Sequence, residues 1–172
     1  MIIADDFFYA VIRDVADPFK KYDEDAGFDV SVPQFDQEFV TAFIEENDKI
    51  GSRAIISEGK IVIRPHGKVK IPSGLFLEFP ANQMLMTCNR SGVASKLQLV
   101  YGAHIVDTPY QGEYMINLIN TSEYQVMISP GERIVQLVRV PVILGLPQKK
   151  DRNKIHMVKT ERGDGGHGST GT

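Results

Sequence analysis

The chain has few of the residues that cross-link small proteins or bind zinc. It contains one cysteine, four histidines and no tryptophan. A single cysteine cannot form an internal disulfide, so a framework of disulfide bridges is excluded and a reducing compartment is expected. The histidines are scattered along the sequence, and no Cys/His spacing of a zinc site is present.

Long apolar runs and an excess of positive charge are also missing. No run approaches the ~20 apolar residues of a membrane span. The first residues include aspartates where a signal peptide needs basic side chains, so we expect a cytoplasmic protein without a membrane segment. The formal net charge of -3 argues against a nucleic-acid partner, because phosphate contacts require a basic surface.

The length and composition are those of an ordinary globular protein. At 172 residues the chain suits one domain, and we expect a single domain over residues 1–172. Apolar residues make up 42% and charged residues 24% of the chain, which is enough to build a core without cross-links.

Hydrophobic residues recur mostly with a period of two, in short runs rich in valine, isoleucine and aromatic residues. Turn signals such as His66-Gly67 and Pro130-Gly131 separate these runs. Many short strands at regular spacing predict an all-β sandwich or barrel. The expected strands cover residues 61–63, 68–71, 75–79, 84–87, 97–101, 114–119, 124–128 and 134–142.

One segment, residues 33–57, breaks this pattern. Phe35, Phe39 and Phe43 lie four residues apart, and the acidic residues Asp36, Glu38, Glu45 and Glu46 fill the other face. This spacing predicts an amphipathic helix of about three turns. We expect its phenylalanines to pack on the sheet, and a helix that binds a partner protein is the alternative.

Five segments depart from plain strand-and-turn chemistry. They are residues 25–30 (DAGFDV), 89–96 (NRSGVASK), 107–113 (DTPYQGE), 130–137 (PGERIVQL) and the glycine-rich tail 162–172. In the second, Arg90, Ser91 and Gly92 combine a cation, a hydroxyl and close backbone approach at a helix start, which suits a phosphate. In the third, Asp107 is a carboxylate able to take a proton from water. Taken alone, each segment is more simply explained as a turn, a capped short helix or a flexible tail.

Together and in this order, the five segments resemble the five motifs of the trimeric deoxyuridine triphosphatase (dUTPase) family. The resemblance implies a jelly-roll-like β-barrel with one inserted short helix and a C-terminal arm at residues 160–172. It also implies a homotrimer whose active sites draw motifs from all three chains. The implied activity is Mg²⁺-dependent hydrolysis of dUTP to dUMP and pyrophosphate, which limits uracil incorporation into DNA and supplies dUMP for dTMP synthesis.

The resemblance assigns a role to each motif residue. Asp29 helps to hold a hydrated Mg²⁺, Asp107 orients and deprotonates the attacking water, and Gln136 lies near the α-phosphate. Tyr110 packs under the deoxyribose and leaves no room for a 2′-hydroxyl. The other expected substrate contacts come from the second and fifth motifs: Arg90, Ser91, Gly92, Arg162, His167, Gly168, Ser169 and Thr170.

Several positions differ from the family pattern. Pro109 stands where an aspartate is common, and Asn89 replaces a usual proline. The segment between the second and third motifs is shorter than usual and has no counterpart of an asparagine that is usual near Tyr101. His167 stands where a phenylalanine closes over the uracil, and an imidazole can still stack on a base.

Two other functions remain open. A dCTP deaminase, or a bifunctional deaminase, shares the fold but needs a general-base glutamate in the strand after the third motif. Residues 114–119 (YMINLI) contain no carboxylate. A non-catalytic nucleotide-sensing regulator is the second alternative, with the 33–57 insertion either decorating the trimer surface or contacting another protein. The presence of Asp107 and Tyr110 favours a catalytic chain.

Overall fold

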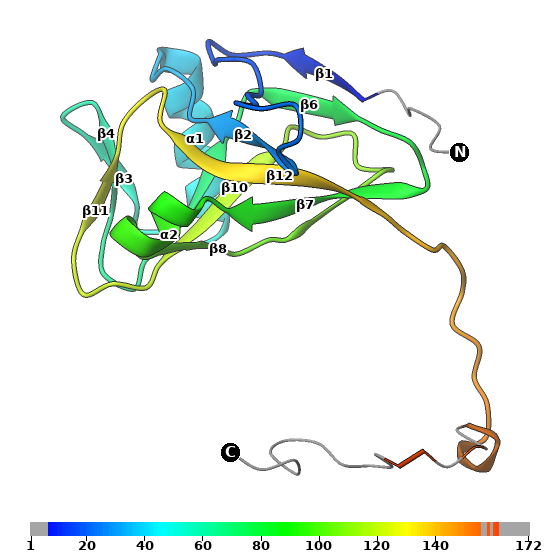
Figure 1. The fold of residues 1–172 in the computed structure, drawn as a ribbon. Helices are drawn as coiled ribbons and strands as arrows, with labels where there is room; N and C mark the ends of the chain where they lie inside the picture. The colour runs from blue at the N-terminus through cyan, green and yellow to red at the C-terminus, as the bar shows by residue number, and fades with distance from the viewer. Residues whose placement is uncertain (1–6, 156–157, 159, 162–172) are drawn as a thin grey trace.

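The computed structural model describes residues 7–155, 158, 160 and 161. Short strands make up most of the regular structure in these residues (Figure 1), which confirms the predicted predominance of β-structure. The strands are β1 (Phe8–Val11), β2 (Gly27–Ser31), β3 (Ile55–Ser57), β4 (Lys60–Ile63), β5 (Lys68–Pro72), β6 (Leu75–Glu78), β7 (Gln83–Asn89), β8 (Leu99–Tyr101), β9 (Ile105–Asp107), β10 (Met115–Asn120), β11 (Val126–Ile128) and β12 (Arg133–Pro141). The helices are α1 (Gln37–Lys49), α2 (Ser91–Leu97) and the 3-10 turn η1 (Arg152–Lys154). Within the described ranges, no helix has the length and apolarity needed to cross a membrane.

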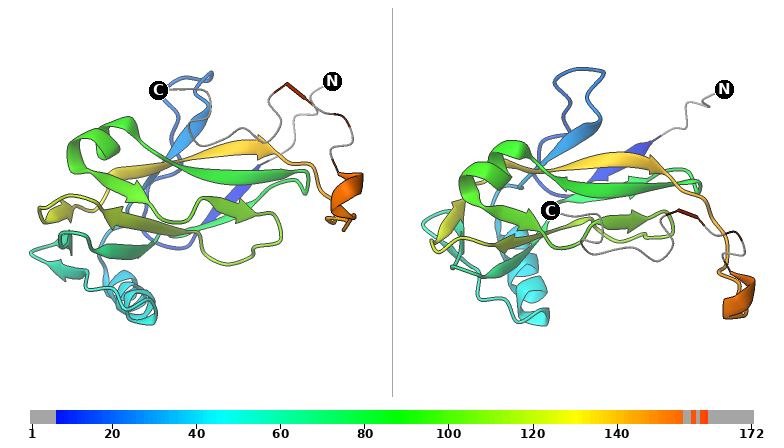
Figure 2. Two further views of the ribbon diagram at one scale, coloured as in Figure 1. Left: turned by 90° about the horizontal axis from the view of Figure 1, so that it is seen from below. Right: turned by 60° about the horizontal axis from the view of Figure 1, so that its bottom comes forward.

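The described strands pair antiparallel in small sheets. The largest has the order β2-β12-β7-β9, and the others are β5-β10-β8, β11-β4-β3 and β1-β6. Helices α1 and α2 lie at opposite sides of the strands (Figure 2). Strand β12 carries Arg133 and Gln136, and β7 ends directly before Arg90.

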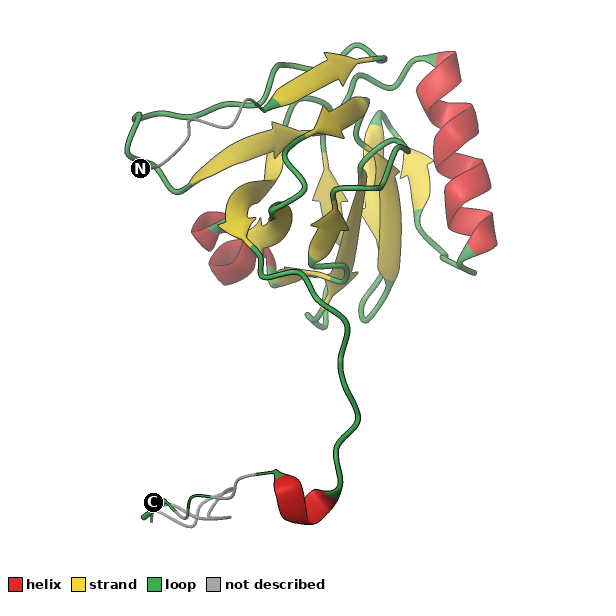
Figure 3. Cartoon of the chain, turned by 90° about the vertical axis from the view of Figure 1, so that its right-hand side faces the viewer, coloured by secondary structure: helices red, strands yellow, loops and turns green. Residues whose placement is uncertain are grey.

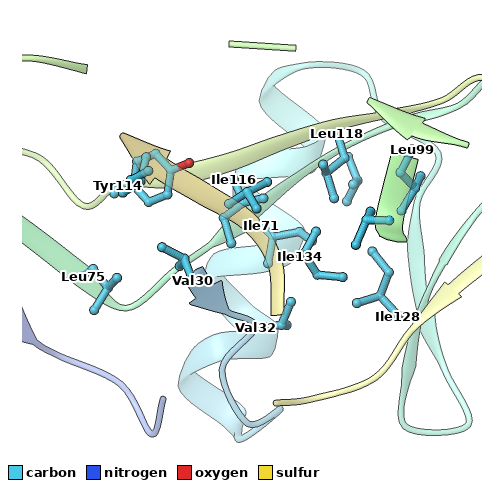
Figure 4. Close-up of a cluster of buried hydrophobic side chains, with 14 of the residues drawn as sticks. Val30, Val32, Ile71, Leu75, Leu99, Tyr114, Ile116, Leu118, Ile128 and Ile134 are labelled. Atoms are coloured by element: carbon cyan, nitrogen blue, oxygen red, sulfur yellow. The ribbon is translucent and has the colours of Figure 1, made fainter. Parts of the chain in front are cut away.

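Alternate residues of the strands point inward and form the core (Figure 4). Ile71, Ile116 and Leu75 are fully buried, and Val30 and Ile134 pack in the same cluster. Because side chains alternate along a strand, the residues between them face outward. This alternation sets which side chains reach the pockets on the sheet surfaces.

Helix α1 confirms the predicted amphipathic helix, with a different start. The Asp36 carboxylate caps the helix by accepting a hydrogen bond from the backbone N–H of Phe39 at 2.8 Å. Phe39 and Phe43 are buried, as expected for a helix packed on the sheet. Phe35 precedes the first helical turn and stacks on Phe39, with ring centroids 4.8 Å apart. Phe35 therefore packs with the helical face without belonging to the helix.

Asn47 attaches α1 to the edge strand β5. Its side-chain amide donates to the carbonyl of Lys70 at 2.8 Å, and its Oδ1 accepts from the N–H of Lys70 at 3.0 Å. A neighbouring strand would make the same pair of bonds. The helix thus satisfies backbone groups that an uncovered edge would leave open to pairing with another chain.

After β12 the chain leaves the strands as an extended segment, residues 142–151 (Figure 3). Three of its apolar side chains are strongly exposed: Ile143 at 103%, Leu144 at 70% and Leu146 at 91% of full exposure. The predicted glycine-rich tail that follows, residues 162–172, lies outside the described residues.

Candidate active site

Strand β12 brings three of the predicted motifs together. It lies between β2 and β7, and Gln136 stands directly opposite Asp29 on one neighbour and Cys88 on the other. Residues directly opposite each other in an antiparallel pair share one face of the sheet, so Gln136 and Asp29 lie side by side. The Gln136 side chain donates from Nε2 to the carbonyl of Asn89 at 2.8 Å, which fixes it next to the second motif.

Two guanidinium groups hold the Asp29 carboxylate. Arg90 donates from Nε to Asp29 Oδ1 at 2.8 Å, and Arg133 lies 3.5 Å from Asp29 Oδ2. The strand register shifts between Arg133 and Val135, and such irregularities often redirect a side chain beside an active site. Arg133 also stacks on the ring of Phe19 at 4.5 Å.

These groups line a cleft of about 940 Å³. Its charged side chains are mainly cationic: it is lined by Lys21, Arg90, Lys96 and Arg133, against the carboxylates Asp25 and Asp29. Ser91 and Gly92 also line the cleft, and a Cβ added to Gly92 would meet no atom within 4 Å. A concentration of positive charge in a chain of net charge -3 suits a polyanionic ligand.

The third motif forms a second, smaller pocket of about 260 Å³. Asp107 ends β9, and its carbonyl accepts from the N–H of Tyr110 at 3.0 Å, which closes a turn. The Tyr110 hydroxyl donates to the carbonyl of Glu113 at 2.8 Å. A Cβ on Gly112 would lie 2.5 Å from that hydroxyl, so this ring position requires glycine at 112.

A buried ion pair anchors the same turn. Arg13 donates from Nε and Nη2 to the two carboxylate oxygens of Glu113 at 3.0 and 2.9 Å. The N–H of Gly74 donates to Glu113 Oε1 at 2.7 Å. The hydrogen bond to Glu113 is the main cause of a raised pKa of the Arg13 guanidinium. The third motif is therefore fixed to the N-terminal segment and to the turn after β5.

The two pockets are separate within one chain and share no lining residue. β2 and β9 are the outer strands of the same sheet, so three strand spacings, about 14 Å, lie between them. Asp107 pairs with Met84 of β7, and Gln136 pairs with Cys88 of the same strand. Four residues of β7 separate these two partners, so Asp107 and Gln136 are also offset by about 13 Å along the strand direction. One chain thus brings Asp29, Arg90 and Gln136 together and keeps Asp107 and Tyr110 apart from them.

The fifth motif falls outside the described residues, so nothing is said of its geometry. This applies to the predicted substrate contacts Arg162, His167, Gly168, Ser169 and Thr170.

Several residues around the two pockets were not predicted from the sequence. Arg13 and Glu113 lie 100 positions apart, and no local pattern connects them. Asn117 could have been identified from the sequence, because it is an amide at an outward-facing position of the apolar run in β10.

The Asp29 carboxylate is the candidate metal ligand. Among the residues that the structure describes, no group of three or more histidine, cysteine, aspartate or glutamate side chains could hold a metal ion. Because Arg90 and Arg133 already pair with the Asp29 carboxylate, a cation held there through water would take its direct ligands from phosphate oxygens and water. Mg²⁺ prefers that mode of binding.

Comparisons with known proteins identify the fold and the family. The dUTPase of Staphylococcus bacteriophage 80alpha, solved with dUpNHpp, has a TM-score of 0.73 and 22% identity, over 97% of this chain and 99% of that one. A dUTPase of S. aureus phage phi11, described with a structural Mg(II) ion, has a TM-score of 0.67 and 18% identity, over 87% and 99%. These likenesses show that the chain has the fold of these dUTPases.

Sequence comparison is more specific. A model of the dUTPase family matches residues 54–171. The deoxyuridine 5′-triphosphate nucleotidohydrolase of Desulfitobacterium hafniense is 38% identical over 115 residues, covering 65% of this chain and 74% of that protein. The chain belongs to the dUTPase family. Asp29 and helix α1 precede the matched span.

Proposed function

We propose that this chain hydrolyses dUTP to dUMP and pyrophosphate by attack of water on the α-phosphorus. The observation that carries the proposal is the pair of pockets in a member of the dUTPase family. One is cationic and suits a triphosphate. The other is small and holds a carboxylate beside a tyrosine, which suits a nucleoside and the attacking water.

In this mechanism Asp107 is the general base and Gln136 contacts the phosphate near the reacting centre. Little covalent chemistry falls to the protein, so positioning and stabilisation of charge dominate the rate. Arg90, Ser91 and Gly92 bind the triphosphate, and Asp29 would hold Mg²⁺ through water. The bound ion would neutralise phosphate oxygens.

Tyr110 selects deoxyribose in this proposal. Its hydroxyl donates to the Glu113 carbonyl, and the absence of a side chain at Gly112 makes room for the hydroxyl end of the ring. A ring held at its hydroxyl end packs against the sugar and excludes a 2′-hydroxyl. UTP is therefore expected to be a poor substrate.

We also propose a homotrimer with shared active sites. The separation of Asp107 from Arg90 within one chain supports it, because a nucleotide bound in one subunit's cleft needs Asp107 from another. The exposed apolar side chains Ile143, Leu144 and Leu146 support it as well, since such a row suits packing against a second copy. Arg162, His167, Gly168, Ser169 and Thr170 would then complete the site from the third chain.

The test is product analysis with Mg²⁺ and, separately, dUTP, dCTP, dTTP and UTP. Formation of dUMP and pyrophosphate from dUTP alone is the expected result. Release of ammonia from dCTP would instead indicate a deaminase. Binding of dUTP without turnover would indicate a nucleotide sensor.

The variant Asp107→Asn tests whether Asp107 is the general base. It should bind dUTP and lose turnover by a factor of about 10²–10⁴, the usual contribution of a positioned general base. The matched control is Asp48→Asn, the same change at an exposed position of α1, which should keep wild-type turnover. Equal turnover in the two variants would contradict the role of Asp107.

A further inference from the structure

The small pocket contains polar groups that the mechanism above does not use. Besides Asp107 and Tyr110, its polar lining consists of Thr87, Tyr114, Lys70 and Asn117. Thr87 and Tyr114 are engaged with each other at 3.0 Å, and burial raises the pKa of the Tyr114 hydroxyl. Lys70 and Asn117 are the polar side chains left to meet a ligand.

Lys70 and Asn117 are direct neighbours across two strands. They are opposite partners in the β5–β10 pair, so their side chains share one face of the sheet. Asn117 Nδ2 donates to the carbonyl of Met115 at 3.3 Å, a long bond within its own strand. Among the described residues, no hydrogen bond to Asn117 Oδ1 is found. In the same residues every buried side-chain oxygen has a hydrogen-bond partner, so an oxygen without one must be accessible. Asn117 Oδ1 is therefore open to the pocket.

Helix α1 holds Lys70 at the pocket wall. The Lys70 ammonium donates to the Glu46 carboxylate. The Asn47 side chain forms hydrogen bonds with both the carbonyl and the N–H of Lys70. An ammonium has three donors, so pairing with Glu46 leaves donors for a ligand.

We propose that Lys70 and Asn117 recognise the pyrimidine edge of the substrate and select uracil over cytosine. The inference rests on the proposed function, because it places the base in the pocket of Asp107. The edge of uracil presents two carbonyl oxygens on either side of an N–H. The Asn117 amide can donate to one of these oxygens and accept from the N–H between them.

Lys70 supplies the selectivity. An amide alone cannot distinguish the two bases, because turning it exchanges donor and acceptor. An ammonium only donates, so it binds the 4-carbonyl oxygen of uracil and is mismatched with the 4-amino group of cytosine. A site built to bond one group rejects an analogue that lacks it, since the buried partner is then left unpaired.

The experiment compares Asn117→Ala, Lys70→Met and the matched control Lys68→Met. Lys68 lies two residues before Lys70 on the same face of β5, outside the pocket lining, so the control removes the same charge. For each protein, kcat and KM are measured with dUTP, and dissociation constants are measured for dUpNHpp and dCTP. Thermal unfolding midpoints check that each variant is folded.

Asn117→Ala should raise KM for dUTP about 10-fold with kcat nearly unchanged, because the lost bond is to the base and not to the reacting phosphate. Lys70→Met should reduce the preference for dUpNHpp over dCTP about 10-fold, and Lys68→Met should leave it unchanged. If Asn117→Ala does not fold, Asn117→Ser replaces it.

An unchanged KM in the Asn117 variant, or an equal loss of preference in both lysine variants, would overturn the inference while dUTP hydrolysis stands. A wild-type chain that neither binds dUpNHpp nor hydrolyses dUTP would overturn the proposed function itself.

Discussion

Glu113 connects two distant parts of the chain to the third motif. Its carboxylate accepts from Arg13 in the N-terminal segment and from Gly74 after β5, and its carbonyl accepts from Tyr110. The side chains of Arg13 and Glu113 are only 8% and 10% exposed. Removing one partner of a buried ion pair leaves an uncompensated charge and costs folding free energy. The Arg13–Glu113 pair therefore holds the turn that carries Tyr110 in place.

The geometry predicts that Arg13→Lys will weaken both folding and substrate binding. A lysine cannot reproduce the two parallel bonds of the guanidinium. We expect the unfolding free energy to fall by about 1–2 kcal/mol, measured by urea denaturation. KM for dUTP should rise more than kcat falls, because Tyr110 loses part of its support.

Arg53→Lys is the matched control, since Arg53 is exposed. It should change the unfolding free energy by less than about 0.5 kcal/mol. Equal losses in the two variants would contradict a special role for the Arg13–Glu113 pair.

At the level of single residues, the sequence located the motif side chains but not the groups that hold them. The candidate roles of Asp107, Tyr110 and Gln136 came from the order of short local segments. The partners of Asp29 and Glu113 come from distant positions, and contacts of that kind depend on the folded topology.

At the level of elements, helix α1 was predictable because its phenylalanine spacing matches the helical period. β1, β3 and β9 were not predicted. They contain three or four residues and are largely exposed, so they are too short to show an alternation of apolar and polar residues. Their positions are set by pairing with longer strands, which a local pattern does not contain.

The link between α1 and β5 predicts a pH-dependent contribution to stability. Hydrogen bonds from Lys49 and then Lys70 lower the pKa of the Glu46 carboxyl below its ordinary value of 4.5. A carboxylate with a lowered folded-state pKa stabilises the folded state above the unfolded pKa. That contribution is lost as pH falls through the folded pKa.

Glu46→Gln should therefore lower the unfolding free energy by about 1 kcal/mol at pH 7, and the deficit should disappear in acid below pH 4.5. Urea denaturation of the variant and the wild type across this pH range measures the difference. The exposed neighbour Glu45→Gln is the control and should run parallel to the wild type. A deficit that is constant with pH would show that the ionised carboxylate is not responsible.

At the level of the whole molecule, the residues proposed for catalysis and for triphosphate binding lie in two separate pockets of the chain. The cleft of Arg90 and the pocket of Asp107 have no lining residue in common. In a ring of three identical subunits with head-to-tail contacts, each interface joins one cleft to a neighbour's pocket. The proposed trimer would thus have three sites, each incomplete without a second chain.

This arrangement predicts that two inactive variants restore activity when they assemble together. Arg90→Ala damages the cleft and Asp107→Asn damages the pocket, so each trimer of one kind should be inactive. In a mixed trimer, one interface joins an intact cleft to an intact pocket, so about one third of the sites should work. Co-expression with two different tags, purification through both tags and measurement of dUMP formation would test this, with the separately purified variants as controls. Activity that stays at the level of the controls would mean that Arg90 and Asp107 act within one chain, and the separation of the two pockets would then have to close by a movement of the third motif.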